Sequence, residues 1–297
     1  MKNYIDLHMH SKYSDDGEFS PSKLVEMCSE KGIRIMAIAD HNLVCAVKEG
    51  RERAEELGIQ YISAIEIDCT YQGVNLHVLG YGISEDQEFF RQLGDQIYQQ
   101  ELMLSDRKIE LTEALGFHVT KEELESLSET GVYTGEMFGE IILGKEEYEK
   151  HPMLEPYRAG GERSDNPYVN FYWDFYSQGK PCYTEVVYPD YAEIVQKIHQ
   201  YGGKAVLAHP GANLKGKFEY FDEMMKEESL DGVEAFSNYH DKETADYFYR
   251  KGQEYGIMTT CGSDFHGKTK PSIKLGECHC PYDQEFLETA LKEAKLI

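Results

Sequence analysis

The segment Ile33-Arg34-Ile35-Met36-Ala37-Ile38-Ala39-Asp40-His41 is an apolar run of strand length that ends on two polar residues. A short apolar run between turn signals is typical of a buried strand. Before it, Ser20-Pro21 predicts a helix start with Ser20 as the N-cap, and this helix should end near Lys31-Gly32. After it, a second helical pattern leads to Gly58. The order helix, strand, helix predicts an α/β fold.

The same alternation continues on both sides of this segment. Further strands are expected near residues 4–8, 60–67, 76–81, 205–208, 232–236 and 257–261, with helical patterns between most of them. Strands that alternate with helices imply a parallel sheet, either open or closed into a barrel. We therefore expect one α/β domain built from residues 1–84 and 181–297.

Between residues 85 and 180 the strand rhythm stops. A long polar helical pattern at 86–115 precedes an aromatic-rich segment at 168–173. Because the strand rhythm resumes at Lys204, residues 85–180 are interpreted as a mainly helical insertion that takes part in substrate recognition.

Charge and composition exclude several classes of partner. The chain has 297 residues with 54 acidic and 30 basic side chains, which gives a formal net charge of −24. Such a charge repels long polyanions, so duplex DNA is not expected as a partner. No apolar run reaches the roughly 18 residues of a membrane span, and the start carries no leader pattern. The seven scattered cysteines fit reduced thiols, and the expected location is the cytoplasm. The sequence sets no expectation for the oligomeric state.

Polar residues gather at the ends of the expected strands. His8 and His10 alternate, so both imidazoles would point the same way from a β segment. Catalytic groups of parallel α/β barrels come from the C-terminal ends of several strands, so these positions can converge on one mouth. Each histidine alone is more often structural, but imidazoles and carboxylates together suit zinc, manganese or iron. The candidate metal ligands are His8, His10, Asp15, His41, Glu66, His77, His209, Asp264 and His266. His77 is the awkward member, because it lies at the start of its strand.

These motifs, taken in order, resemble the polymerase and histidinol phosphatase (PHP) family. The resemblance rests on His8-x-His10 with Ser14-Asp15 and Gly17, Ala39-Asp40-His41-Asn42, Glu66, Ala208-His209-Pro210-Gly211 and Gly262-Ser263-Asp264-x-His266. It covers residues 1 to about 82 and about 192 to 277. The insertion resembles one branch, the phosphoesterases that act on nucleoside 3′,5′-bisphosphates and on the 5′ ends of short RNAs.

The resemblance implies a distorted (β/α)7 barrel with two or three divalent metal ions, manganese, zinc or iron. By motif, His8, His10, Glu66 and Asp264 would hold the first ion, Glu66, His77 and His209 the second, and Asp15, His41 and His266 the third. Asp15 is preferred by its spacing from His8, with Asp16 as the alternative. Asp40 would orient His41 or another neighbour of the ions.

The expected chemistry follows from the charge of a phosphate ester. Close-set cations neutralise that charge and lower the pKa of a bridging water, which favours in-line attack by a metal-activated hydroxide. His209 or Asp264 would be available for proton transfer if not committed to metal, and His41 is expected to be needed for turnover.

Scarce cations in the insertion are the expected substrate-binding residues. They are Arg107, Lys108, Arg158, Arg163 and Lys180. Guanidinium groups could clamp a second phosphate, although solvated surface charges are the alternative. The aromatic segment through Trp173 could stack a nucleobase or form the insertion's own core.

The expected function is therefore hydrolysis of phosphate esters of small molecules, with nucleotides such as nucleoside 3′,5′-bisphosphates or a short RNA end as partners. Histidinol-phosphate phosphatase and cyclic phosphodiester hydrolase are enzymatic alternatives. A non-catalytic PHP-like binding module is an alternative of another class.

Overall fold

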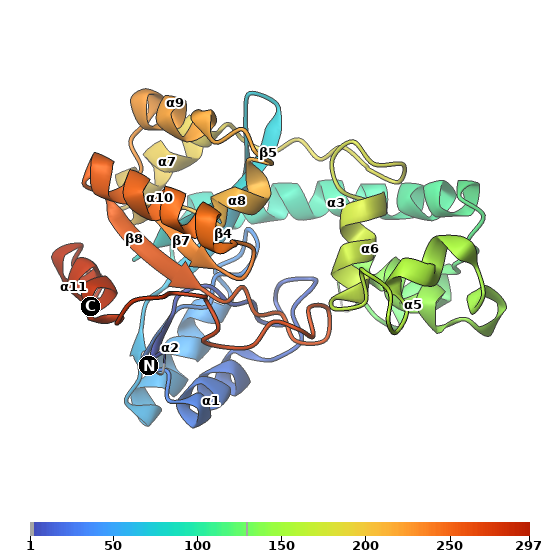
Figure 1. The fold of residues 1–297 in the computed structure, drawn as a ribbon, viewed down its shortest axis with the longest axis horizontal. Helices are drawn as coiled ribbons and strands as arrows, with labels where there is room; N and C mark the ends of the chain where they lie inside the picture. The colour runs from blue at the N-terminus through green and yellow to red at the C-terminus, as the bar shows by residue number, and fades with distance from the viewer. Residues whose placement is uncertain (1–2, 129) are drawn as a thin grey trace.

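The computed structural model describes residues 3–128 and 130–297 and divides them between two small sheets with flanking helices and a helical lobe (Figure 1). The first sheet has three strands in the order β1-β2-β3, and the second has five in the order β4-β5-β6-β7-β8. The strands are β1 (Ile5–Asp6), β2 (Ile35–Met36), β3 (Gln60–Tyr61), β4 (Ala64–Tyr71), β5 (Val74–Tyr81), β6 (Lys204–Leu207), β7 (Gly232–Ser237) and β8 (Met258–Gly262).

Strand directions differ between the sheets. All pairs in the first sheet are parallel. In the second, β5 runs antiparallel to both β4 and β6, whereas β6, β7 and β8 are parallel. The wholly parallel arrangement is therefore wrong for β5, because residues 72 and 73 close a tight β4–β5 hairpin in place of a helical crossover.

The closed barrel expected by resemblance is not found among the described residues, whose strands form two separate sheets. Contacts beyond the strand ends still join the sheets. Leu7 N donates to Cys261 O at 3.0 Å, and an isolated bridge pairs Met9 with Phe265. On the other side, His41 and Glu66 form a parallel bridge. Because β1 and β2 are only two residues long, the chain beyond them leaves the ladder and carries His8 and His41 toward one point.

The helices begin and end largely where the sequence signals lie. Ser20 caps the first helix by accepting from Lys23 N, and Gly32 ends it in the left-handed region at φ 80°. The helices are α1 (Pro21–Lys31), α2 (Ala46–Leu57), α3 (Glu88–Ala114), α4 (Lys121–Glu125), α5 (Gly135–Gly144), α6 (Pro167–Phe175), α7 (Tyr191–Gln200), α8 (Pro210–Asn213), α9 (Glu219–Glu227), α10 (Lys242–Tyr255) and α11 (Glu285–Glu293), with 3-10 turns at Glu146–Tyr148 and Pro152–Tyr157.

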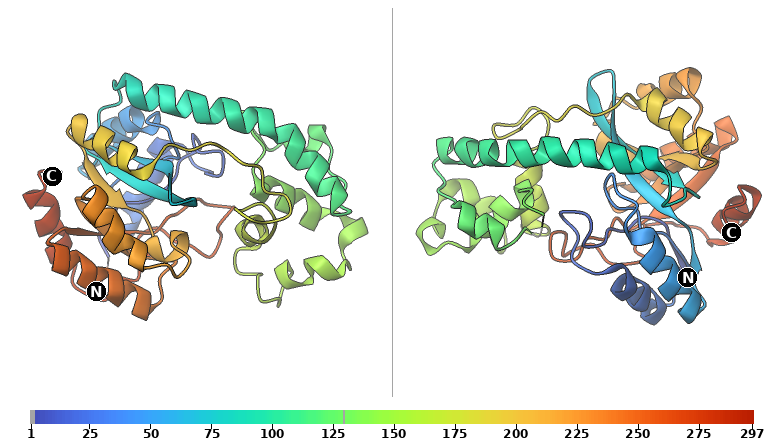
Figure 2. Two further views of the ribbon diagram at one scale, coloured as in Figure 1. Left: turned by 90° about the horizontal axis from the view of Figure 1, so that it is seen from above. Right: turned by 180° about the vertical axis from the view of Figure 1, so that it is seen from behind.

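The helical lobe, residues 88–128 and 130–182, has an apolar core of its own, which includes Phe117, Phe138 and Phe171. Figure 2 shows α3 running from the sheets to the far end of this lobe, with the chain before α7 returning beside it. Val187 N donates to Gln100 Oε1 at 2.9 Å and Gln100 Nε2 donates back to Val187 O, which ties that returning segment to α3. The lobe is thus connected to the sheets by the long helix α3 and by the returning segment before α7, which is hydrogen-bonded to it.

Within the part of the chain that the structure describes, no helix combines the length and the apolar character needed to cross a membrane.

Candidate metal centre

Two histidines that follow β1, a carboxylate on β4 and a carboxylate that follows β8 lie close together. His8 Nε2 and His10 Nε2 lie 3.1 Å apart. Glu66 Oε2 is 3.1 Å from each of these nitrogens. Asp264 Oδ1 is 3.4 Å from His8 Nε2 and 3.1 Å from His10 Nε2. Two imidazole nitrogens and two carboxylate oxygens that surround one point form a suitable donor set for a divalent metal ion.

The other oxygen of Glu66 faces two further histidines. Glu66 Oε1 is 2.8 Å from His77 Nδ1 and 3.0 Å from His209 Nε2. The direction of β5 explains the position of His77. Because β5 runs antiparallel to β4 and β6, it starts at the edge of the sheet where those two strands end. A residue near the start of β5 therefore lies beside His209, which follows β6. Glu66 is therefore placed to bridge two metal positions.

Asp16, rather than Asp15, joins the remaining histidines. Asp16 Oδ2 lies 3.0 Å from His266 Nε2 and 3.9 Å from His41 Nε2. Asp15 instead accepts a hydrogen bond from Thr130 Oγ1 at 2.6 Å, so its carboxylate faces the helical lobe. The structure therefore groups Asp16, the alternative, and not Asp15 with these histidines, because adjacent residues in an irregular loop point in different directions.

The donor atoms fall into three groups whose members lie within 4.8 Å of one another. These groups differ from the sets implied by the resemblance, since His10 joins Asp16, His41 and His266, and His209 joins His8, Glu66 and Asp264. The third group is His41, Glu66 and His77. We call the residues of these groups the donor cluster: His8, His10, Asp16, His41, Glu66, His77, His209, Asp264 and His266.

Neighbouring groups fix the direction of several imidazoles. Glu234 accepts from His8 Nδ1 at 3.1 Å and from the backbone N–H of His209 at 2.9 Å, where the backbone has the unusual φ of 22°. The Ser14 hydroxyl donates to Asp40 at 3.2 Å and lies 3.1 Å from His10 Nδ1. Hydrogen bonds at Nδ1 leave Nε2 of His8 and His10 for a metal ion. Asp40 therefore acts on His10 through Ser14.

Asp68 holds the outer nitrogen of His77. The distance from Asp68 Oδ1 to His77 Nε2 is 3.0 Å. Asn42 fixes this carboxylate, because its Nδ2 donates to Asp68 Oδ2 at 2.6 Å and its Oδ1 accepts from Asp68 N at 3.0 Å. The sequence analysis missed both Asp68 and Glu234. The signals present were a carboxylate two residues after Glu66 on the same strand, and one inside the apolar strand β7.

The pKa shifts of Glu66 and His10 favour the protonation states that bind cations. Burial alone would raise the pKa of Glu66, but His8, His77 and His41 hold it well below its ordinary value. Burial and the neighbouring His266 and His41 lower the pKa of His10 to about 4, so its imidazole is neutral near pH 7. A neutral imidazole offers its lone pair to a metal without proton competition.

Unpaired buried atoms test whether metal ions fit here. Five side-chain atoms of the donor cluster, Asp16 Oδ1, His41 Nδ1, Glu66 Oε2, His209 Nδ1 and Asp264 Oδ1, are buried and make no contact with the geometry of a hydrogen bond among the described residues. A buried polar atom without a partner is costly, and several in one cluster indicate a missing ligand. Divalent cations fit this site, because the carboxylate oxygens are negatively charged and the nitrogens of neutral imidazoles offer lone pairs.

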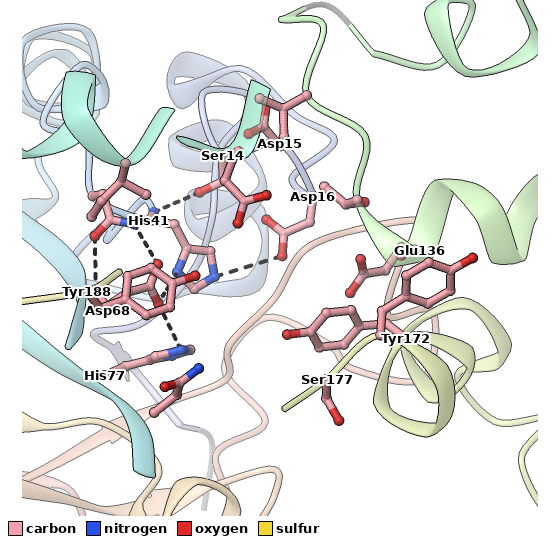
Figure 3. Close-up of a pocket in the computed structure, with 18 of the residues that line it drawn as sticks. Ser14, Asp15, Asp16, His41, Asp68, His77, Glu136, Tyr172, Ser177 and Tyr188 are labelled. Atoms are coloured by element: carbon pink, nitrogen blue, oxygen red, sulfur yellow. Dashed lines mark hydrogen bonds and ion pairs between the residues drawn. The ribbon is translucent and has the colours of Figure 1, made fainter. Parts of the chain in front are cut away.

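A cavity of about 330 Å³ opens from the donor cluster toward the helical lobe. In Figure 3, Asp16, His41 and His77 lie on one side of it, and Glu136 and Tyr172 of the helical lobe lie on the other. Trp173, which follows Tyr172 on α6, also lines the cavity, whereas Phe171 is buried in the core of the lobe. The aromatic segment therefore serves both the cavity and the core.

Of the expected substrate-binding cations, Lys108 lines the cavity, and its ammonium donates to Glu101 at 2.6 Å and to Tyr133 O at 3.0 Å. The other four do not line it. Arg107 pairs with Glu110, Arg163 pairs with Asp174, Arg158 donates to backbone carbonyls, and Lys180 is exposed.

Two lysines that the sequence analysis did not select, Lys215 and Lys270, also line the cavity. Lys270 is buried at 7% exposure, and its ammonium lies 2.7 Å from Asp264 Oδ2. Burial alone would lower the pKa of Lys270, but Asp264 raises it, so the side chain carries a fixed positive charge.

Comparison with known protein families gives a match over most of the chain. The model of the PHP domain matches residues 6–228, a range that includes much of the donor cluster as well as the helical lobe.

Individual relatives are distant but nearly full-length. A 5′-3′ exoribonuclease of Haemophilus influenzae is 25% identical over 90% of this chain and 91% of its own. A phosphoribosyl 1,2-cyclic phosphate 1,2-diphosphodiesterase of Eggerthella lenta is 26% identical over 89% and 94%. A 3′,5′-nucleoside bisphosphate phosphatase of Chromobacterium violaceum is 22% identical over 92% and 90%.

Among solved structures, a Bifidobacterium adolescentis protein considered a metal-dependent phosphoesterase superposes with a TM-score of 0.77. It is 24% identical and covers 97% of this chain and 95% of its own, so it supports the fold.

Proposed function

Because the chain belongs to the PHP family of metal-dependent phosphoesterases, we propose that it hydrolyses phosphate esters of nucleotides, with nucleoside 3′,5′-bisphosphates as the preferred substrates. The observation that carries this proposal is the shared cavity. One wall carries Asp16, His41 and His77 of the donor cluster, which suit a phosphate, and Tyr188 lies on the same side (Figure 3). The opposite wall carries Tyr172 and Trp173, which suit a base. The volume of about 330 Å³ lies in the range of small-molecule sites.

Bound divalent ions would neutralise the phosphate charge and activate water for in-line attack. His8, His10, Glu66, His77, His209 and Asp264, with Asp16, His41 and His266, would hold two or three of them. The two residues expected in proton transfer, Asp264 and His209, do not line the cavity, whereas His41, which is expected to be needed for turnover, does. We infer that His41, together with Asp16 and His77, forms the part of the donor cluster that faces the reacting phosphate.

A second phosphate would meet Lys215 on the cavity wall. Within the described residues Lys215 forms no ion pair, although the chain is strongly acidic. Partial burial and the nearby Lys180 lower the pKa of Lys215, so a neighbouring anion would relieve the repulsion between the two ammonium groups. This favours a substrate with two phosphates over a mononucleotide.

Cyclic phosphodiester hydrolysis is the second candidate, because the E. lenta relative bears that name and is similar over nearly its whole length. A short 5′-phosphorylated RNA presents the same phosphate chemistry and belongs in the same assay. Histidinol phosphate also belongs there, as the family's other monoester.

The test is a panel assay with manganese, in which phosphate release is measured from bisphosphates, mononucleotides, a 5′-phosphorylated oligonucleotide, histidinol phosphate and cyclic phosphates. We expect the highest kcat/KM for bisphosphates and no turnover after exhaustive chelation.

Lys215→Met should raise KM for the bisphosphate more than for the mononucleotide. Arg107→Met removes the same charge away from the cavity and serves as the control. A preference for cyclic phosphates would replace the proposal, and activity that survives chelation would contradict the metal mechanism.

A further inference from the structure

We propose that Lys270 is a substrate-contacting residue whose ammonium donates a hydrogen bond to an oxygen of the phosphoryl group under attack. The proposal rests on the phosphoesterase activity proposed above and adds a cation that lies outside the donor cluster. Lys270 is buried at 7% exposure and lines the cavity from the segment after β8. Its position beside Asp264 and His266 brings it to the edge of the donor cluster.

The hydrogen bonds of the ammonium leave a donor for a ligand. A lysine ammonium has three N–H groups. One reaches Asp264 Oδ2 at 2.7 Å and a second lies 3.3 Å from His266 Nε2. Among the described residues the third has no acceptor within hydrogen-bond distance, and the ring of Tyr239, whose centroid is 5.4 Å from Nζ, is a cation–π neighbour of the ammonium. Because Lys270 is held in the wall of the cavity, this N–H is available to an oxygen inside it.

Metal binding would free a second N–H group. His266 Nδ1 lies 2.9 Å from the backbone carbonyl of Asp264, so the ring proton sits on Nδ1 and the lone pair on Nε2. If His266 Nε2 held a metal ion, its lone pair would no longer accept a hydrogen bond from Lys270. The ammonium then needs another acceptor in a buried place, and a phosphoryl oxygen at the donor cluster supplies one.

A purely supporting role is the competing explanation, since Lys270 could serve only to hold Asp264. Tyr239 offers the matched comparison, because its hydroxyl donates to the same Asp264 Oδ2 at 2.6 Å. Tyr239 does not line the cavity. Loss of either side chain removes one donor from Asp264, but only loss of Lys270 removes a charge from the cavity wall.

The experiment titrates inorganic phosphate into the manganese-loaded full chain by calorimetry and measures manganese content in the same samples. Lys270→Met should weaken phosphate binding by about tenfold or more, the usual effect of losing a charge-assisted hydrogen bond, with unchanged manganese content. Tyr239→Phe should keep the phosphate affinity close to wild type. Lys270→Arg should retain part of the affinity, and Lys270→Gln replaces the methionine variant if that variant does not fold.

Three results would overturn the proposal. These are unchanged phosphate affinity in Lys270→Met, a parallel loss of manganese and phosphate affinity in that variant, or equal weakening by Tyr239→Phe. The titration needs no turnover, so a wrong choice of nucleotide substrate would leave its outcome readable.

Discussion

Asp15 and Asp16 are neighbours in the loop after His10, and their carboxylates serve different parts of the molecule. Asp16 Oδ2 lies 3.0 Å from His266 Nε2, so its carboxylate is turned toward the donor cluster. Asp15 meets Thr130 of the helical lobe, and burial raises its pKa to about 6. The Asp16 carboxylate therefore faces the donor cluster, whereas the Asp15 carboxylate accepts a hydrogen bond from a hydroxyl group of the helical lobe.

We predict that Asp16→Asn lowers both manganese content and kcat/KM, by at least the roughly 10–100-fold that loss of a supporting metal-site residue costs. Asp15→Asn should keep the manganese content, because the amide can still accept from Thr130. Metal analysis and steady-state kinetics on both variants test this. Equal losses in the two variants would show that both carboxylates serve the metals.

For single residues, the sequence indicates the candidate metal ligands better than it indicates the residues that hydrogen-bond to those ligands. Histidines at strand ends can be selected because strands of a sheet converge there. Glu234 could not be selected, since its partner His8 is distant in sequence and a strand pattern does not show which side chains meet across a sheet. The substrate-binding role of the cations of the lobe stays a prediction. The sequence does not show that Arg107 pairs with Glu110 and Arg163 with Asp174.

Among the elements, α3 makes a close backbone contact with the segment that follows His41. Gly94 lies where α3 crosses the segment after His41, and a Cβ there would be 2.5 Å from Asn42 O. Asn42 itself has a left-handed backbone with φ 56° and holds Asp68. A displacement of α3 would therefore reach His77 through Asn42 and Asp68.

We predict that Gly94→Ala destabilises the fold by about 1–3 kcal/mol, the usual cost of overpacking, and also lowers kcat. Gly144→Ala is the control, because Gly144 lies at the end of α5 with no atom within 4 Å of an added Cβ. Thermal unfolding and kinetics of the two variants provide the measurement. A Gly94→Ala protein as stable and active as the Gly144→Ala protein would contradict the contact.

Element boundaries were more predictable than strand direction. Ser20, Gly32 and Gly58 act at helix ends as local rules require, because capping depends on neighbours in sequence. The reversal of β5 was missed because an alternating apolar pattern is the same in either direction. The residues that join β4 to β5, Gln72 and Gly73, both adopt positive φ and were the available turn signal.

For the whole molecule, the donor cluster links segments from both ends of the chain. We predict that manganese raises the melting temperature above that of chelated protein, since a ligand that binds only the folded state adds about 2.7 kcal/mol per site at 100 times its Kd. Differential scanning calorimetry with manganese or chelator measures the shift, and sodium chloride of equal ionic strength is the control. An unchanged melting temperature would mean that the cluster does not bind manganese.

The overall architecture was predictable as α/β with a helical interruption, but its closure was not. Sequence patterns report which residues are buried in a strand, whereas closure depends on how many hydrogen bonds each strand shares with its neighbours. With two-residue strands at β1, β2 and β3, the ladder is too short for a continuous ring.

The β4–β5 hairpin also bears on the order in which the chain can fold. Glu66, Asp68 and His77 become neighbours through one tight turn, so they can meet early, before distant segments are in place. His8 and Asp264 meet only when the two ends of the chain come together. The hairpin can therefore bring part of the donor cluster together before the two ends of the chain meet, whereas the complete cluster requires both ends.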